Sequence, residues 1–496
     1  MPVKLAKEAK VDYLTEKTDY EKLGLKAGLE IHQQLDTVHK SFCKCSTKMK
    51  QTKHKYVIAR KLHPVASEMG EVDVAAQFEY LRNRMFRYEV FKDETCLVEL
   101  DCEPPHNLDS EALEIALRIA LSFNCQIPSE IQIMRKTVID GSNPCGFQRT
   151  MIVGLNGYLK YKDKKISITQ VCLEEDSASI IKEENGVVTY KNNRLGIPLV
   201  EIDTDLLIGY APEEIQEIAY LIGLTCRLAG KTKTGIGSIR QDVNVSIENG
   251  VRVEIKGVQE LSLISKVIEK EVKRQLSEKV KEETRAALPD GTTRFMRPLP
   301  GSNRMYPETD VPPIPVSEEF IRNIRKSLPE PVEKKLDMLK SKLKLSDQLT
   351  NEMIKSEYLP LFEKIVKAKN VEPSVIATAF TQTLRDLRRR GIDTSRFTET
   401  HFSEVFGALE RKKIAKEAIP EILVYFSKNP EGSVGDAIRE LNLGTISTEE
   451  LKRVVKDIIS QPEITLDRAI GLVMSKVRGK VDAQTVIKVV KELLQT

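Results

Sequence analysis

Tryptophan is absent from this 496-residue chain, and aromatic residues make up only 5% of it. No run of about 18 apolar residues occurs, which excludes an ordinary transmembrane helix. Residues 1–23 are charged and lack the apolar core of a signal peptide, so we expect a cytoplasmic protein without membrane association. The eight cysteines are scattered, and without an export signal we expect free thiols rather than disulfides.

Several motifs of nucleotide-binding and amide-hydrolysing enzymes are missing as well. No GxxxxGK(S/T) P-loop is present, and GIGSIR at 235–240 has Arg240 where a dinucleotide fingerprint has its third glycine. There is also no GxSxG sequence and no cysteine–histidine motif of an amidase. A nucleotide therefore needs another kind of site here, and the chain shows no means of hydrolysing an amide.

The hydrophobic pattern changes near residue 316. Before it, short alternating stretches indicate strands and longer periodic stretches indicate helices, of which 110–124 is the clearest. The proline-rich stretch MYPETDVPPIPVSEE then interrupts the pattern, and the rest of the chain is helical almost to its end. We therefore predict an α+β protein with a polar lead-in (1–23), a mixed domain (24–315), a helical domain (316–410) and a helical tail domain (411–496).

The segment GLEIHQQL, residues 28–35, alternates apolar residues with Glu30 and His32. On a strand these two side chains lie on one face, about 7 Å apart. A carboxylate and an imidazole so placed can bind one cation or position one water. Taken alone, the segment also fits a half-buried strand with a solvated polar face.

Residues 237–260 have the pattern of a β-hairpin, with a turn at Glu248-Asn249-Gly250. The period of two places Asp242 and Asn244 on one face of the first strand, and Glu254 and Lys256 together on the second. The register across the turn cannot be read from the sequence, so whether the two pairs meet stays open.

Three further segments carry charges in unusual positions. CLEEDSAS, 172–179, has three successive carboxylates, and a bound cation would reduce the repulsion between their charges. An exposed acidic loop has the same sequence pattern. NNRLGIPLVEID, 192–203, leads from Arg194 into an apolar strand. PGSNRMYPETD, 300–310, places Arg304 close in sequence to Glu308 and Asp310. A guanidinium and two carboxylates in one turn can bind a phosphate and its metal, but an ordinary surface loop has the same composition.

Together, the ordered segments GLEIHQQL, FCKCST, MRKTVIDGSN, FQRT, LEEDSAS, NNRLGIPLVEI, GSIRQDVNVSI, EIKGVQEL and MYPETDVPP resemble the GatB/GatE family. The resemblance spans about 24–315 and recurs in the tail, and it is closer to the archaeal E type than to the bacterial B type. It implies a cradle-shaped catalytic domain that binds ATP, Mg²⁺ and the charged end of tRNA(Gln) carrying glutamate. It also implies a glutaminyl-tRNA synthase of the glutamine-hydrolysing type: an ATP-dependent carbon–nitrogen ligase that phosphorylates the glutamate γ-carboxylate and amidates it with ammonia from glutamine or asparagine.

The resemblance also implies roles for particular residues. The implied catalytic and metal-binding residues are Glu30, His32, Glu175 and Asp242, with Glu174 as a further metal ligand. Lys136, also an implied catalytic residue, and Arg135 match positions along the route by which ammonia reaches the site. We assign ATP contacts to Arg194, Glu254, Lys256 and Arg304, and tRNA contacts to Arg478 and Lys480. The implied partner is an asparaginase-like subunit, in a heterotetramer with two copies of each subunit.

The chain departs from the family pattern in two places. FCKCST, with Cys43 and Cys45, resembles half of a zinc site of some relatives, but the CxxC that completes it is missing, so we predict buried thiols instead. Only AALPDGTTRFMR follows the EIKGVQEL helix, where E-type subunits carry an insertion similar to part of aspartyl-tRNA synthetase. Either the lineage lacks this insertion or it has been removed.

Two other classes of function compete with this interpretation. A ligase acting on a small molecule would need no basic helical tail such as the one here, where RDLRRR (385–390), RKK (411–413) and the 471–486 segment are positively charged. A non-catalytic RNA-binding or assembly subunit would not need the acidic residues of the front domain.

Overall fold

The computed structural model describes residues 19–494, except 51, 52, 68, 236, 302, 303, 461–463 and 478. The chain forms two compact units, the first ending at Val332 and the second beginning at Glu333. This division falls beyond the proline-rich stretch near 316, because helix α5 (Glu318–Lys326) packs into the first unit through Ile324. No helix in the described part of the chain is long and apolar enough to cross a membrane.

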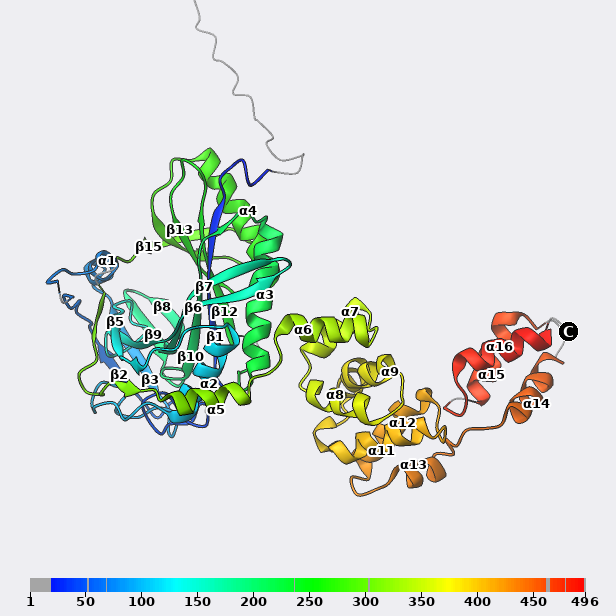
Figure 1. Cartoon of the computed structure of the whole chain (residues 1–496). Coiled ribbons are helices and arrows are strands. Elements are labelled where there is room, and N and C mark those ends of the chain that lie inside the picture. The colour runs from blue at the N-terminus through cyan, green and yellow to red at the C-terminus, as the bar shows by residue number, and fades with distance from the viewer. Residues whose placement is uncertain are drawn as a thin grey trace, which may run out of the picture. The chain divides into compact units, whose positions relative to one another are not determined.

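One large sheet dominates the first unit (Figure 1). Its strand order is β15-β14-β13-β12-β1-β10-β7-β6-β5-β16, with β11 paired to β1. All the pairings are antiparallel except that of β13 with β14. The strands are β1 (Lys26–Gln34), β5 (Met134–Thr137), β6 (Phe147–Tyr161), β7 (Lys164–Glu175), β10 (Pro198–Thr204), β11 (Leu207–Ile208), β12 (Ile239–Ser246), β13 (Val253–Val258), β14 (Glu283–Ala287), β15 (Thr293–Pro298) and β16 (Met305–Pro307).

Two smaller sheets complete the strands described in this unit. The first has the order β2-β3-β9-β8 and consists of β2 (Tyr56–Arg60), β3 (Met85–Val90), β8 (Ser179–Glu184) and β9 (Val187–Lys191). The second pairs β4 (Glu130–Ile131) with β17 (Ile314–Pro315).

Helices α2 (Ser110–Ser122), α3 (Pro212–Ala229) and α4 (Leu261–Ser277) cover one face of the large sheet (Figure 1). Their apolar residues and those of the central strands form one continuous core. The predicted helix at 110–124 is confirmed as α2, and Asp109 caps it by accepting from the Ala112 N–H. The short helix α1 (Val74–Leu81) packs near β15.

The second unit is helical, as the sequence predicts, and the α+β class of the whole chain is confirmed. The last three helices have a small core of their own, which includes Leu451, Val455, Val473, Val486 and Val490. The helices are α6 (Val332–Asp337), α7 (Asp347–Ile354), α8 (Leu359–Ala368), α9 (Pro373–Thr378), α10 (Leu384–Arg389), α11 (Glu399–Glu410), α12 (Ile419–Lys428), α13 (Val434–Glu440), α14 (Thr448–Ile459), α15 (Leu466–Lys476) and α16 (Ala483–Leu494).

Candidate active site on the polar face of the large sheet

Strand β1 lies in the middle of the large sheet, between β10 and β12. Leu29 and Ile31 are buried in the core, so the alternation of a strand turns Glu30 and His32 to the opposite face. This polar face collects charged residues from strands far apart in the sequence. The cross-strand partners are Asp203 and Asp242 for Glu30, and Glu201 and Arg240 for His32.

The buried His32 imidazole lies between two carboxylates. Its Nε2 is 3.0 Å from Glu201 Oε2 and 3.3 Å from Glu30 Oε1. Burial by itself lowers the pKa of His32, but the hydrogen bonds to Glu201 and Glu30 raise that pKa to about 10. The ring is therefore an imidazolium at neutral pH, and its charge compensates part of the negative charge of the two carboxylates.

Lys256 likewise compensates negative charge, on the other side of Glu30. Its Nζ lies 2.9 Å from Asp242, 2.9 Å from Glu254 and 4.0 Å from Glu30. Burial opposes the charged ammonium, yet these three carboxylates raise the pKa of Lys256 well above its usual value. Asp242 also accepts from the Gly257 N–H at 2.8 Å. A bulge in the register between Gln241 and Val243 accompanies these contacts, so the two strands of the predicted hairpin do meet through their polar residues.

Two groups of possible metal ligands share Glu30. The first combines Glu30, His32 and Glu201, and the second combines Glu30, Asp242 and Glu254; within each group the ligand atoms lie within 4.8 Å of one another. Because Mg²⁺ prefers oxygen ligands, the all-carboxylate group fits that ion better than the group with an imidazole. A bound Mg²⁺ would compete with the Lys256 ammonium for the same oxygen atoms.

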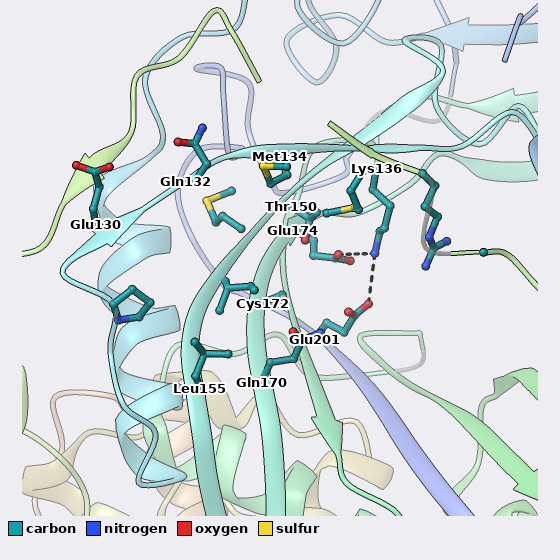
Figure 2. A pocket seen from close by; sticks show the side chains of 16 residues that line it. Glu130, Gln132, Met134, Lys136, Thr150, Leu155, Gln170, Cys172, Glu174 and Glu201 are labelled. Atoms are coloured by element: carbon teal, nitrogen blue, oxygen red, sulfur yellow. Dashed lines mark hydrogen bonds and ion pairs between the residues drawn. The ribbon is translucent and has the colours of Figure 1, made fainter. Parts of the chain in front are cut away.

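A cleft of about 550 Å³ opens beside the first group. Lys136 of β5 spans it: its Nζ lies 2.5 Å from Glu174 and 3.6 Å from Glu201 (Figure 2). These two carboxylates raise the pKa of Lys136 against the effect of burial. Gln148 donates to the second oxygen of Glu174 at 2.9 Å, so Glu174 is held in place from two strands. The cleft lining is a mixture of polar and thioether or thiol side chains, which includes Gln132, Met134, Gln170, Cys172 and Arg304.

The structure does not bring Glu175 into this site. Adjacent residues of a strand point to opposite faces, so Glu174 and Glu175 cannot both join the polar face. Glu175 is buried and instead accepts from the Arg149 backbone N–H at 3.1 Å and from its guanidinium at 3.4 Å. Of the two adjacent glutamates, Glu174 is the one that faces Lys136.

Arg135, Arg149 and Glu308 form a separate ion-pair cluster. Arg149 Nε donates to Glu308 at 2.7 Å, and Arg135 donates both to Glu308 and, at 3.2 Å, to Asp310. These contacts hold the 304–310 segment against β5 and β6. In this arrangement Glu308 anchors the loop and is not free to ligate a phosphate-bound metal.

The structure divides the predicted ATP contacts into three kinds. Glu254 and Lys256 lie in the carboxylate group around Glu30. Arg304 lines the cleft beside Lys136. Arg194 lies elsewhere: it donates to the Ser177 and Ala178 carbonyl oxygens and lies 3.7 Å from Asp176, so it stabilises the turn after β7.

Sequence reasoning left Glu201 and Asp203 out of the site. Asp203 accepts from Gln170 at 2.7 Å, and burial together with Glu201 and Glu30 raises its pKa to about 8. The signal was present in PLVEID, where the two acids stand two residues apart and therefore share a strand face. It was weak because the apolar surroundings suggested a buried strand and nothing more.

Of the two predicted tRNA contacts in the tail, Arg478 lies outside the residues that the structure describes. Lys480 is half-buried and follows the turn at Val477. Asp482 caps α16 by accepting from the Gln484 N–H at 2.8 Å and pairs with Lys416 at 2.8 Å. In RDLRRR, the arginines Arg385, Arg388 and Arg390 pair with neighbouring acids at the surface.

The polar face of the large sheet gathers carboxylates, an imidazole and lysines beside a cleft, as the ligand-binding surface of an enzyme domain would. Residues 25–322 match the GatB/GatE catalytic domain, and residues 360–494 match the GatB domain found in the same proteins. The chain belongs to the GatB/GatE family.

Several archaeal proteins are similar to almost the whole chain. The E-type subunit of glutamyl-tRNA(Gln) amidotransferase from Methanocaldococcus jannaschii is 36% identical over 626 aligned residues, which cover 96% of this chain and 99% of the relative. The E-type subunits from Pyrobaculum islandicum and Saccharolobus solfataricus are 36% and 35% identical, again over 96% of this chain. Since each alignment is longer than this 496-residue chain, these relatives carry residues that have no counterpart here.

Proposed function

We propose that this chain is the subunit of a glutamyl-tRNA(Gln) amidotransferase that activates and amidates the tRNA-bound glutamate. The relatives described above are named as E subunits of glutamyl-tRNA(Gln) amidotransferase, which supports the proposal. The observation that carries the proposal is the register of β1, which places Glu30 between two candidate cation sites on one sheet face. Such a surface suits phosphoryl transfer, which depends on charge neutralisation and positioning more than on covalent chemistry.

In the proposed reaction ATP phosphorylates the γ-carboxylate of glutamate on tRNA(Gln), and ammonia then displaces phosphate to form the amide. Glu30, Asp242 and Glu254 would hold Mg²⁺, which when bound neutralises phosphate charge. We assign contacts with phosphate oxygens to Lys256 and Arg304. The acyl phosphate reacts with water, so positioning and exclusion of water matter more than a general base.

Ammonia would reach the carbonyl carbon through the cleft spanned by Lys136. Lys136, Glu174 and Glu201 line this cleft and are joined by ion pairs (Figure 2). Glu201 also contacts His32, which links the cleft to the carboxylates around Glu30. The polar side chains along the cleft can pass a small nucleophile from one hydrogen bond to the next. We propose an asparaginase-like subunit as the source of ammonia and a complex with two copies of each subunit.

The helical unit would contact the body of the tRNA. Such contacts to phosphates from lysine and arginine are directed by the shape of the RNA and weaken with salt. Lys480, beside the start of α16, is the described residue that we assign to this role.

Reconstitution tests the proposal directly. The chain is mixed with its asparaginase-like partner, ATP, Mg²⁺, asparagine and Glu-tRNA(Gln), and the aminoacyl group is analysed after deacylation. We expect ATP-dependent glutamine, and a parallel reaction with ammonium chloride in place of the partner and asparagine should also form it. Glu30→Gln should abolish product in both reactions, whereas Glu318→Gln, an exposed position on α5, should not. Absence of product from the unmodified chain in both reactions refutes the proposal.

A further inference from the structure

Three cysteines and a glutamate that are not part of the proposed active site converge in one place. Cys43 and Cys45 lie in the turns after β1, and Cys96 and Glu99 lie in the turns after β3. Their four ligand atoms are all within 4.8 Å of one another. Cys43, Cys45 and Glu99 are buried and Cys96 is half-buried, which leaves a path by which an ion can enter. Cys96 and Glu99 come from a segment about 50 residues after the FCKCST motif, so the motif alone does not predict them.

The distances within this group match a tetrahedral zinc site. Zinc–sulfur bonds of about 2.3 Å and zinc–oxygen bonds of about 2.0 Å, at a tetrahedral angle, separate a sulfur from an oxygen ligand by about 3.5 Å. Cys43 Sγ lies 3.5 Å from Glu99 Oε1, and Cys45 Sγ lies 3.8 Å from Glu99 Oε2. The side chains thus stand at the spacing of ligands without any rearrangement of the backbone.

The surroundings of the group also suit a metal ion held by anionic ligands. Lys40 is buried, and its ammonium donates to Glu99 and to the Glu94 carbonyl oxygen. Three thiolates and a carboxylate carry four negative charges, which a divalent ion and Lys40 would reduce to one. The Cys96 backbone N–H donates to Glu99 Oε2 at 2.6 Å, and this contact orients the carboxylate as hydrogen bonds around metal ligands commonly do.

We propose that Cys43, Cys45, Cys96 and Glu99 bind one structural zinc ion. All four positions of a tetrahedral ion are then taken by side chains, so the site would have no place for a substrate. Its effect would be to tie the segment after β1 to the 91–100 turns. On binding, each thiol releases its proton to solvent, so affinity falls at low pH. The site is independent of the proposed amidotransferase chemistry.

Metal analysis of the purified full chain tests this proposal. We expect about one zinc per chain by mass spectrometry, as a closed four-ligand site requires. Replacement by Co²⁺ should produce the sulfur-to-metal charge-transfer and ligand-field absorption of a tetrahedral thiolate site. Cys96→Ser should lose both signals, while Cys102→Ser, an exposed cysteine outside the group, should keep them.

Two results overturn the proposal. One is a reduced, folded chain that contains no zinc and takes up neither Zn²⁺ nor Co²⁺ at equimolar concentration. The other is zinc retained by Cys43→Ser and Cys96→Ser alike. Because the metal is measured on the unmodified chain, the test does not depend on the variants folding, and circular dichroism of each variant shows whether loss of metal is local.

Discussion

The buried carboxylate of Glu308 should be a main anchor of the loop that carries Arg304. Glu308→Gln removes the negative charge that both Arg135 and Arg149 contact. Charge-assisted hydrogen bonds contribute about 1.5–3 kcal/mol each. Glutamine keeps one acceptor oxygen, and the two arginines keep Asp310 and Glu175, so the loss should lie at the lower end of the about 3–6 kcal/mol that two such bonds contribute. We expect the first unit to lose about 3 kcal/mol of stability at pH 7.

The lowered pKa of Glu308 implies a loss of stability of similar size. Burial raises this pKa, but Arg135, the Asp310 N–H and Arg149 outweigh it and lower the pKa from 4.5 to about 2. At about 1.4 kcal/mol per unit, the shift corresponds to about 3 kcal/mol of stability, somewhat less where solvent screens the pair. Because the folded-state pKa is the lower one, this stabilisation is present above about pH 4.5 and is lost as the pH falls toward 2.

Hydrogen exchange followed by mass spectrometry suits this measurement, because the chain has two units and no tryptophan to report on one of them. Peptides covering β5 and β6 should exchange faster in Glu308→Gln at neutral pH, and the difference from the parent chain should shrink below pH 4.5. Asp310→Asn is the matched control: its side chain is half exposed, so we expect a change below about 1 kcal/mol. A Glu308→Gln effect no larger than this control would refute the reasoning.

Three further outcomes follow from the site and the tail. Asp242→Asn should lower ATP-dependent product formation by at least about 100-fold while tRNA affinity is kept, as filter binding would show; loss of binding alone would contradict a metal-binding role. Glu174→Gln should reduce ammonia-dependent activity more than Glu175→Gln does, and Glu175→Gln should mainly lower thermal stability. Equal effects of the two variants on activity would contradict the placement of these neighbours on opposite faces of the sheet. Lys480→Ala should reduce the slope of log affinity against log salt for tRNA by about 1, and an unchanged slope would exclude a phosphate contact.

The local pattern predicted much of the fold correctly. The alternation in GLEIHQQL predicted β1 and placed Glu30 and His32 on one face, and the hairpin strands near Asp242 and Glu254 were also correct. Period-two alternation could have separated Glu174 from Glu175 as well, because consecutive strand residues point to opposite faces. The domain boundary was harder to place, since α5 follows the proline-rich stretch and yet packs back onto the first core.

Convergence of distant segments could not be read from local patterns. Glu201 lies beside His32 only because β10 pairs with β1 at that register. Lys136 on β5 reaches Glu174 two strands away, on β7, and Glu201 three strands away, on β10. Cys96 and Glu99 likewise join Cys43 and Cys45 only after the turns behind β1 and β3 meet. Pairing between strands depends on the whole sheet, whereas a sequence window reports only its own residues.

The sequence by itself therefore determined the class of the fold, the strand faces and, through the motifs, the family. Periodicity and turn residues are local properties, and they act the same way wherever the segment lies. Tertiary structure decided which charges become neighbours, and hence which of them share a proton or a cation. Coulomb interactions depend on distance and burial, and both arise only when the strands are assembled into the sheet.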